Sequence, residues 1–271
     1  MNIKEFMGVL PDEKPLDRLV TDGGFCGIFR RIAVIGDSLS SGEFESLKAD
    51  GTHVYHDMYE YSWGQYIGRS CGSTVYNFSK GGMTAKEYME EFADKFGFWN
   101  TDKLCQAYII ALGVNDIHGR KMEIGTIGDI CKEDYKKNAP TFAGYYAQII
   151  QKMKTLQPRA KFFLVTEPSD GDPEGRDEKR KQVRDLLAQF CEVFDRTYLI
   201  DLFTYAPKND DVYRDVFRLG HLTATGYILT ARMIESYIDY IIRKNPKDFA
   251  QVGFIGTDLY YEPEEPFFEE K

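Results

Sequence analysis

Short, almost continuous apolar runs alternate along the chain with longer segments in which apolar residues recur every three or four positions. The runs are rich in β-branched and aromatic residues, which is typical of strands that are covered on both faces of a sheet. We therefore predict five buried strands, at Arg31–Ile35, Thr74–Phe78, Ala107–Leu112, Lys161–Thr166 and Tyr198–Leu202.

The segments between these runs predict helices. The clearest is Glu178–Phe194, whose apolar residues follow a helical period at Val183, Leu186, Leu187, Phe190 and Phe194. The others are Ser62–Arg69, Thr84–Phe96, Phe142–Leu156 and Thr223–Ile242.

Regular alternation of strands and helices favours an α/β protein with a parallel sheet between two layers of helices. We expect a three-layer α/β/α sandwich with a flavodoxin-like, five-stranded parallel sheet in the order 2-1-3-4-5. It should form a single domain over residues 1–271, with a core at about 31–243 and an extension at each end. The glutamate-rich segment 247–271 is expected to be an exposed or wrapping arm.

Composition narrows the range of partners. The chain has 34 Lys and Arg against 43 Asp and Glu, a formal net charge of −9, so no nucleic-acid partner is expected. It has no run of 18 apolar residues, so we expect no membrane partner either. Five widely spaced cysteines without a CxxC pair are typical of free thiols, and no signal-peptide pattern opens the chain, so a cytoplasmic protein is expected. The oligomeric state stays open.

The loops after the strands are the places to look for chemistry, because ligands of such sheets bind at the carboxyl ends of the strands. The first loop reads Gly36-Asp37-Ser38, and it places the Ser38 hydroxyl where a strand gives way to a helix. Taken alone, Ser38 also fits a helix cap. The GxSxG motif of α/β-hydrolases is absent from this loop.

The next two loops contain candidate hydrogen-bond donors. Gly82 lies just before a predicted helix, where glycine lets the backbone approach a ligand closely. Asn115, in Gly113-Val114-Asn115-Asp116, could donate from its side-chain amide to an oxyanion. Each residue alone fits an ordinary turn equally well.

His221 is the candidate base, since it follows the last strand's loop and precedes the long C-terminal helix. His53 and His56 have ligand-like spacing, but no further cysteine or carboxylate pattern accompanies them. We therefore predict no metal site.

Together, four blocks resemble the SGNH hydrolase superfamily of GDSL-like esterases and lipases: Gly36-Asp37-Ser38, the loop from Asn77 to Gly82, Gly113–Asp116 and His221–Tyr227. The resemblance covers about residues 31–240. It implies Ser38 as nucleophile, His221 as base, and an oxyanion hole made by the Ser38 N–H, the Gly82 N–H and the Asn115 side chain. It also implies a small-molecule ester substrate, and neither a metal nor an organic cofactor.

The chain departs from the family pattern at two positions. Ser79 stands where the family usually has glycine, a departure that is tolerable because Gly82 fills the oxyanion position. Arg218 occupies the slot of the aspartate that usually orients the histidine, and arginine cannot accept a hydrogen bond. We expect a backbone carbonyl to orient His221 instead. The alternatives are Asp215 or Asp211, or loss of activity.

Aromatic residues after the first helix offer a substrate platform. Tyr55, Tyr59, Tyr61 and Trp63 could form a surface for a sugar or aryl group, or simply pack an extended loop. With no large apolar groove evident, we predict a serine esterase for short acyl groups, such as acetyl on a carbohydrate. An acyltransferase using the same site and a non-catalytic binding relative are the alternatives. A flavodoxin-type nucleotide binder lacks support, since no phosphate-binding glycine motif occurs.

Overall fold

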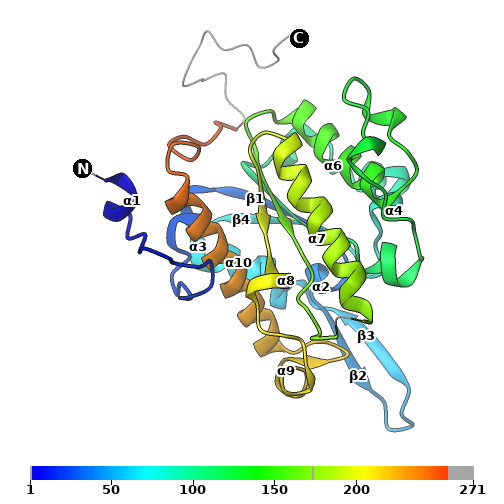
Figure 1. Ribbon diagram of the computed structural model, residues 1–271. Helices are drawn as coiled ribbons and strands as arrows, with labels where there is room; N and C mark the ends of the chain where they lie inside the picture. Colours follow the sequence, from blue (N-terminus) through cyan, green and yellow to red (C-terminus); the bar gives the residue numbers. More distant parts are fainter. Residues whose placement is uncertain (1, 173, 256–271) are drawn as a thin grey trace.

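Five parallel strands form the central sheet of the protein (Figure 1), whose computed structural model describes residues 2–172 and 174–255. The spatial order is β4-β1-β5-β6-β7, which is the predicted order 2-1-3-4-5. The fold class is thus confirmed, and each strand lies within two residues of its prediction: β1 (Arg31–Gly36), β4 (Thr74–Ser79), β5 (Ala107–Ala111), β6 (Lys161–Val165) and β7 (Thr197–Ile200). Most of the segment expected as an acidic arm, 247–271, lies outside the described residues.

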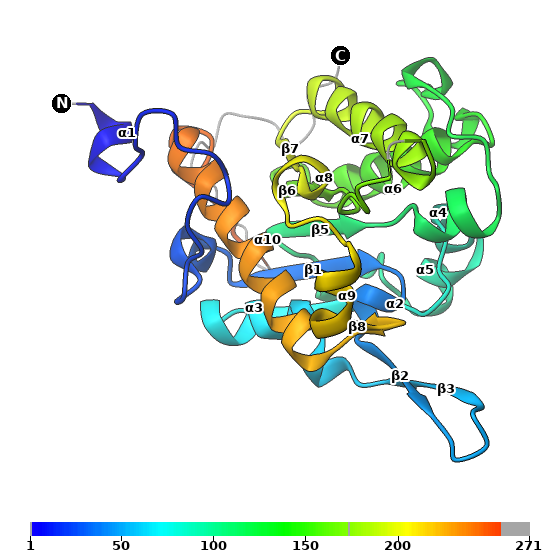
Figure 2. The ribbon, with the colours of Figure 1, turned by 60° about the horizontal axis from the view of Figure 1, so that its bottom comes forward.

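Helices cover both faces of this sheet (Figures 1 and 2). One layer consists of α3 (Trp63–Cys71) and α10 (Ala224–Lys244), which pack against each other. The other consists of α4 (Ala85–Glu87), α5 (Ala93–Lys95), α6 (Phe142–Leu156) and α7 (Arg176–Val193). The helix predicted over 84–96 is interrupted by a π-helical turn, Tyr88–Phe92, that separates α4 from α5. The part of the chain that the structure describes also has short helices at α1 (Ile3–Phe6), α2 (Ser38–Ser41), α8 (Leu202–Tyr205) and α9 (Asp211–Phe217).

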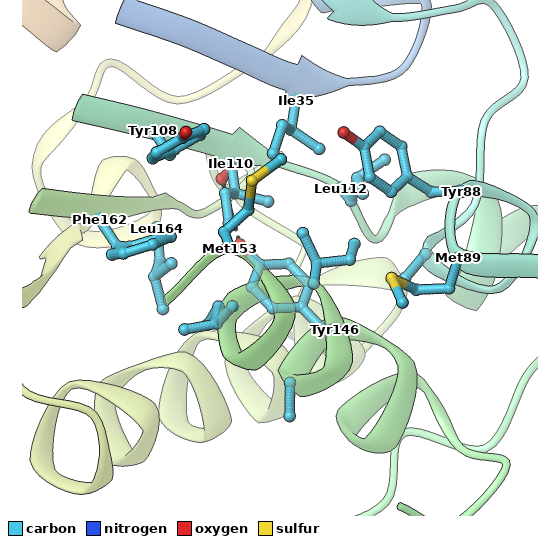
Figure 3. Close-up of a cluster of buried hydrophobic side chains, with 14 of the residues drawn as sticks. Ile35, Tyr88, Met89, Tyr108, Ile110, Leu112, Tyr146, Met153, Phe162 and Leu164 are labelled. Carbon is cyan, nitrogen blue, oxygen red and sulfur yellow. Dashed lines mark hydrogen bonds between the residues drawn. The ribbon is translucent and has the colours of Figure 1, made fainter. Parts of the chain in front are cut away.

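Alternate residues of each strand supply two separate cores. In β1, Ala33 and Ile35 pack with α6 and α7 in the cluster that Figure 3 shows. Their neighbours Ile32 and Val34 pack on the opposite face with α3 and α10. Because a shift of one residue would exchange these faces, burial on both sides fixes the strand register.

Because of this register, strands β1, β4 and β5 end beside one another, and the loops that carry the candidate site residues start there. Gly36, the last residue of β1, pairs with Ser79 of β4 on one side and with Ala111 of β5 on the other. The three loops that follow therefore leave the sheet side by side at its carboxyl edge.

A β-hairpin occupies part of the stretch that we expected to be a loop. Strands β2 (Glu43–Leu47) and β3 (His53–Asp57) pair antiparallel and project from the body of the molecule (Figure 2). Both strands are mostly polar, so the alternation of apolar and polar residues that marks a strand is not visible in the sequence. The turn residues Asp50-Gly51 are nevertheless a hairpin signal. A second, minimal hairpin joins β8 (Arg218–Leu219) to β9 (His221–Leu222).

All five cysteines are free thiols, as expected, and Cys26, Cys71 and Cys105 are buried. Within residues 2–172 and 174–255, no helix has the length and apolar character needed to cross a membrane.

Candidate active site

A serine and a histidine that lie far apart in the sequence meet at the carboxyl edge of the sheet. Ser38 is the first residue of α2, and Asp37 caps this helix by accepting a hydrogen bond from the Leu39 N–H at 3.1 Å. The cap holds the Ser38 side chain at the strand–helix junction. The Ser38 hydroxyl lies 3.0 Å from His221 Nε2, which is a hydrogen-bonding distance suited to proton transfer.

The opposite side of the His221 ring faces a carboxylate that we did not predict. Glu45 Oε2, on β2, lies 3.4 Å from His221 Nδ1, and Glu43 Oε1, on the same strand, lies 3.2 Å from Nε2. Glu45 also contacts His53 Nδ1. Burial opposes ionisation of Glu45, but hydrogen bonds from His53 and His221 leave its pKa below the ordinary value. Glu45 is thus a carboxylate that can accept the Nδ1 proton.

This arrangement corrects the expected orientation of the base. Asp211 is exposed and pairs with Arg214 at 2.8 Å, and Asp215 is exposed on the same short helix α9. Neither contacts His221, and among the described residues no backbone carbonyl accepts a hydrogen bond from Nδ1. The sequence concealed Glu45 because it lies 176 residues before His221 and reaches it only through the hairpin.

Gly220 makes the approach of Glu45 possible. It forms the turn between β8 and β9 with a φ of +67°, a conformation that favours glycine. A Cβ at this position would overlap Glu45 Oε2. The turn therefore allows Glu45 to lie directly against the backbone beside His221.

The two predicted oxyanion donors outside the serine's own loop, Gly82 and Asn115, lie in the loops after β4 and β5. Gly82 has a φ of +73°, and a Cβ built there would meet no atom within 4 Å, so its backbone faces open space. Asn115 lies two residues after Gly113 in the loop that follows β5. Its Nδ2 donates a hydrogen bond to the Met83 carbonyl at 3.1 Å and lies 3.5 Å from Asp37 Oδ2. Asn115 thus links the second loop to the nucleophile's loop.

Two aspartates of these loops, Asp37 and Asp116, are buried. Burial, together with the nearby carboxylates Glu167 and Asp116, raises the pKa of Asp37 to about 7. Burial likewise raises the pKa of Asp116 to about 7. Asp116 Oδ1 accepts the Ala85 N–H at 2.9 Å, whereas Oδ2 has no hydrogen-bond partner in the part of the chain that the structure describes.

Asp116 should therefore make the protein's stability depend on pH. Its folded-state pKa, about 7, exceeds the ordinary value of 3.8, so its protonated form stabilises the fold. This contribution is complete below about pH 3.8 and is lost as the pH rises to about 7. We expect the free energy of unfolding of Asp116→Asn, relative to wild type, to rise by about 2–3 kcal/mol between pH 5 and pH 8.5. Urea unfolding at both pH values measures this difference, and equal differences at the two would contradict the assignment.

The expected aromatic platform does not form as a unit. Tyr55 is 56% exposed, and its ring packs edge-on against His221 with centroids 5.7 Å apart. Tyr61 is exposed but packs against Phe44. Tyr59 donates its hydroxyl to the Val75 carbonyl, and Trp63 is only 2% exposed in the core. Tyr55 alone of the four thus contacts a predicted catalytic residue.

A small, mostly apolar cavity reaches Asp37 and Leu39, the residues on either side of Ser38 in the sequence. It has a volume of about 100 Å³ and is lined by Leu39, Leu112, Val165, Leu222 and Met233, among other side chains. Trp63 also contributes to its wall. The site thus combines a serine–histidine pair, nearby donors and a confined apolar space.

These features define the class of protein as an SGNH-type hydrolase: a parallel α/β/α fold with a serine and a histidine in contact at its carboxyl edge. Residues 34–229 match the model of the GDSL-like lipase/acylhydrolase family, and the chain belongs to this family. The protein is accordingly an ester-bond hydrolase. No curated protein matches the sequence.

Solved structures with the same fold include two carbohydrate esterases. A protein from Lactobacillus plantarum has a TM-score of 0.58 and 17% identity, covering 78% of this chain and 97% of that one. A family 2 carbohydrate esterase from Clostridium thermocellum, in complex with cellohexaose, has a TM-score of 0.55 and 16% identity over 81% and 65%. A family 2 enzyme with a carbohydrate-binding domain from Corynascus thermopiles (Myceliophthora fergusii) has a TM-score of 0.55 and 17% identity over 79% and 66%. At these identities the similarity concerns the fold.

Proposed function

We propose that the protein is a serine esterase that removes a short acyl group, such as acetyl, from a small or carbohydrate ester through an acyl-enzyme on Ser38. The observation that carries this proposal is the 3.0 Å contact between Ser38 Oγ and His221 Nε2, with the Glu45 carboxylate at Nδ1. The nucleophile thus contacts its base, and the base contacts the carboxylate that orients it.

In the first half of the reaction, neutral His221 donates its Nδ1 proton to Glu45 in a hydrogen bond, which leaves Nε2 free to accept the proton of Ser38. Ser38 Oγ then attacks the ester carbonyl. Negative charge on the carbonyl oxygen is received by the Ser38 N–H, the Gly82 N–H and the Asn115 amide, each contributing up to about 3 kcal/mol. The tetrahedral intermediate collapses as His221 returns the proton to the departing alcohol.

In the second half, water replaces the alcohol. His221 accepts a proton from this water as the water oxygen attacks the acyl carbonyl. As the bond to Ser38 Oγ breaks, His221 returns the proton to Ser38 Oγ, and the acid and free Ser38 are released. The imidazolium formed in both halves is stabilised by Glu45 at Nδ1 and by Glu43 near Nε2. These two glutamates replace the aspartate that the family usually supplies.

Three observations support a short acyl group and a carbohydrate alcohol. The apolar cavity beside Leu39 has about 100 Å³, which suits a few carbon atoms. Tyr55 presents an exposed ring beside His221, as a sugar-binding surface requires. Two structures with a similar fold are carbohydrate esterases.

Hydrolysis rates over 4-nitrophenyl esters from acetate to palmitate, measured beside acetate release from acetylated sugars, test the proposal. We expect acetate or butyrate to be fastest and palmitate to be at least about tenfold slower, since the cavity confines the chain. Fluorophosphonate treatment should place its adduct on the peptide that contains Ser38. Preference for palmitate would refute the short-acyl assignment, and absence of both turnover and adduct would refute the esterase. An added alcohol acceptor distinguishes acyl transfer from hydrolysis.

A further inference from the structure

A second cavity, of about 270 Å³, lies beside the proposed catalytic pair and carries an unusual concentration of arginines. Its wall includes Leu39 and Gly220, the direct sequence neighbours of Ser38 and His221. Four guanidinium groups line it against two carboxylates, Glu167 and Asp170. The four are Arg176, Arg180, Arg214 and Arg218. The cavity is thus positively charged in a chain whose formal net charge is −9.

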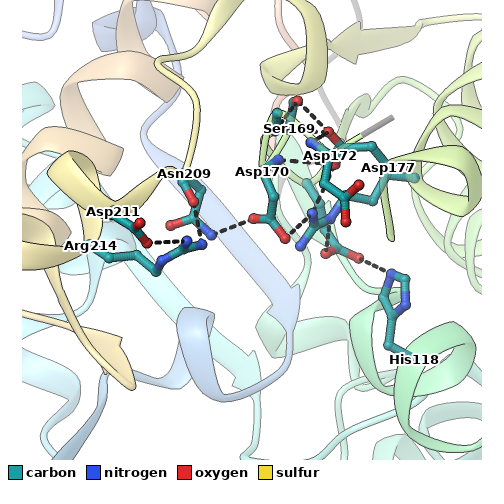
Figure 4. A network of polar contacts seen from close by, with 11 residues as sticks. His118, Ser169, Asp170, Asp172, Asp177, Asn209, Asp211 and Arg214 are labelled. Atoms are coloured by element: carbon teal, nitrogen blue, oxygen red, sulfur yellow. Dashed lines mark hydrogen bonds and ion pairs between the residues drawn. The ribbon is translucent and has the colours of Figure 1, made fainter. Parts of the chain in front are cut away.

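Two of these arginines are neutralised within the protein. Arg180 pairs with Glu167 at 3.0 Å, with Asp170 at 2.5 Å and with Asp177 at 2.9 Å, in the network that Figure 4 shows. Arg214 pairs with Asp211 at 2.8 Å. The charges of these two side chains are thus already paired within the protein.

The other two arginines have no such partner. The Arg218 guanidinium donates from Nε and Nη2 to the Gly220 carbonyl, at 3.3 and 3.1 Å, and no carboxylate pairs with it among the described residues. Burial lowers the pKa of Arg218, so its charge is held against a desolvation cost. Arg176 is exposed at the start of α7 and has no ion pair within residues 2–172 and 174–255. An anion entering the cavity would supply the missing partner.

The pKa of His118 reflects the positive charge of the nearby arginines. Burial, together with the positive charges of Arg176 and Arg180, lowers the pKa of His118 to about 4. The ring is therefore neutral at pH 7 and adds no charge to the cavity. The positive character comes from guanidinium groups, which bind planar carboxylates and phosphates through paired hydrogen bonds.

We propose that the arginine cavity, with Arg218 and Arg176 as its free cations, binds a carboxylate or phosphate group that the ester substrate carries within a few bonds of its scissile carbonyl. The inference rests on the proposed esterase function and narrows its substrate to acidic esters. Arginine in the position where the family usually has aspartate then acts as a substrate-binding residue.

Matched pairs of charged and neutral esters test this inference. On the alcohol side, 4-acetoxybenzoate and 4-acetoxyphenyl phosphate are compared with methyl 4-acetoxybenzoate. On the acyl side, 4-nitrophenyl hydrogen glutarate is compared with 4-nitrophenyl hexanoate. We expect at least one anionic ester to exceed its neutral partner about tenfold in kcat/KM, and the pair that does so shows which side carries the anion and which anion fits. Raising NaCl from 0.05 to 0.5 M should reduce the ratio.

Substitutions of the arginines test whether the preference for anionic esters arises in the arginine cavity. Arg218→Gln should lower the ratio of anionic to neutral kcat/KM about tenfold, Arg218→Lys less, and Arg176→Gln about threefold. Arg196→Gln is the charge-matched control, because Arg196 precedes β7 at the opposite edge of the sheet and should leave the ratio unchanged. If Arg218→Gln does not fold, the exposed Arg176→Gln still tests the site.

The possible failures are distinct. Equal turnover of charged and neutral esters, or a ratio that neither Arg218→Gln nor Arg176→Gln changes, would overturn the arginine cavity while leaving the esterase intact. Turnover of no ester in either pair, together with no fluorophosphonate adduct on Ser38, would overturn the proposed function itself.

Discussion

Ser38→Ala should lower kcat for 4-nitrophenyl acetate by at least about 10³-fold and abolish fluorophosphonate labelling. The expectation follows from the 3.0 Å contact with His221, since alanine removes the only atom that could form the acyl-enzyme in the proposed mechanism. Residual turnover would come from the oxyanion donors and from water. Steady-state kinetics and intact-mass analysis measure the two effects.

A neighbouring serine supplies the matched control. Ser40 lies on the same short helix, but its buried hydroxyl has no hydrogen-bond partner in the part of the chain that the structure describes. Ser40→Ala removes that unpaired hydroxyl and should retain both labelling and most activity. If Ser40→Ala lost labelling and Ser38→Ala kept it, the nucleophile would be misassigned.

Glu45→Gln should lower kcat by about 10²- to 10⁴-fold with little change in KM. Glutamine keeps the shape of the side chain but can donate to His221 Nδ1, which favours the tautomer with its proton on Nε2. That proton blocks acceptance of the Ser38 hydrogen. The amide also gives no charge to stabilise the imidazolium. The pH dependence of kcat, measured with 4-nitrophenyl acetate, should change as well, which a purely structural role would not produce.

The control for Glu45 comes from the aspartates that the sequence suggested. Asp215 is exposed on α9 and does not contact His221, so Asp215→Asn should leave kcat unchanged. A large loss in Asp215→Asn with full activity in Glu45→Gln would restore the orienter expected from sequence.

The same contact can be disturbed from the backbone side. Gly220→Ala places a Cβ where Glu45 Oε2 lies, so kcat should fall about tenfold or more. Gly51→Ala is matched to it, because Gly51 also has a positive φ, of +81°, but meets nothing within 4 Å at the hairpin tip. Both variants should lose about 1 kcal/mol of stability from backbone strain, and only Gly220→Ala should lose activity.

In the proposed enzyme, the two glutamates on β2 take over the role of the aspartate that the family usually has near the histidine. Arg218 in the usual aspartate slot removes one orienting carboxylate, and Glu45 brings another from a different element. The position three residues before His221 can then hold a positively charged residue in place of the usual aspartate. In the proposed enzyme, orientation of the base and recognition of an acidic substrate are thus assigned to separate side chains.

Local sequence determined the sheet and the edge where chemistry occurs. Apolar runs such as Arg31–Ile35 can be buried on two faces only as central strands, and their alternation with amphipathic helices leaves few topologies. The loops that contain Ser38, Gly82 and Asn115 then fall at the carboxyl edge, because parallel strands end there together. In the structure, the Ser38 hydroxyl lies 3.0 Å from His221 Nε2, and the Asn115 amide lies 3.5 Å from Asp37, the neighbour of Ser38.

Tertiary structure alone decided which groups face the histidine. Glu43, Glu45 and Ser46 make β2 look like a polar loop, and its pairing with β3 depends on contacts that no local pattern encodes. The exclusion of Asp211 and Asp215 likewise depends on the direction in which α9 points. Hydrophobic periodicity fixes elements because burial acts along each segment, whereas the position of a charged side chain depends on the packing of segments far apart in the chain.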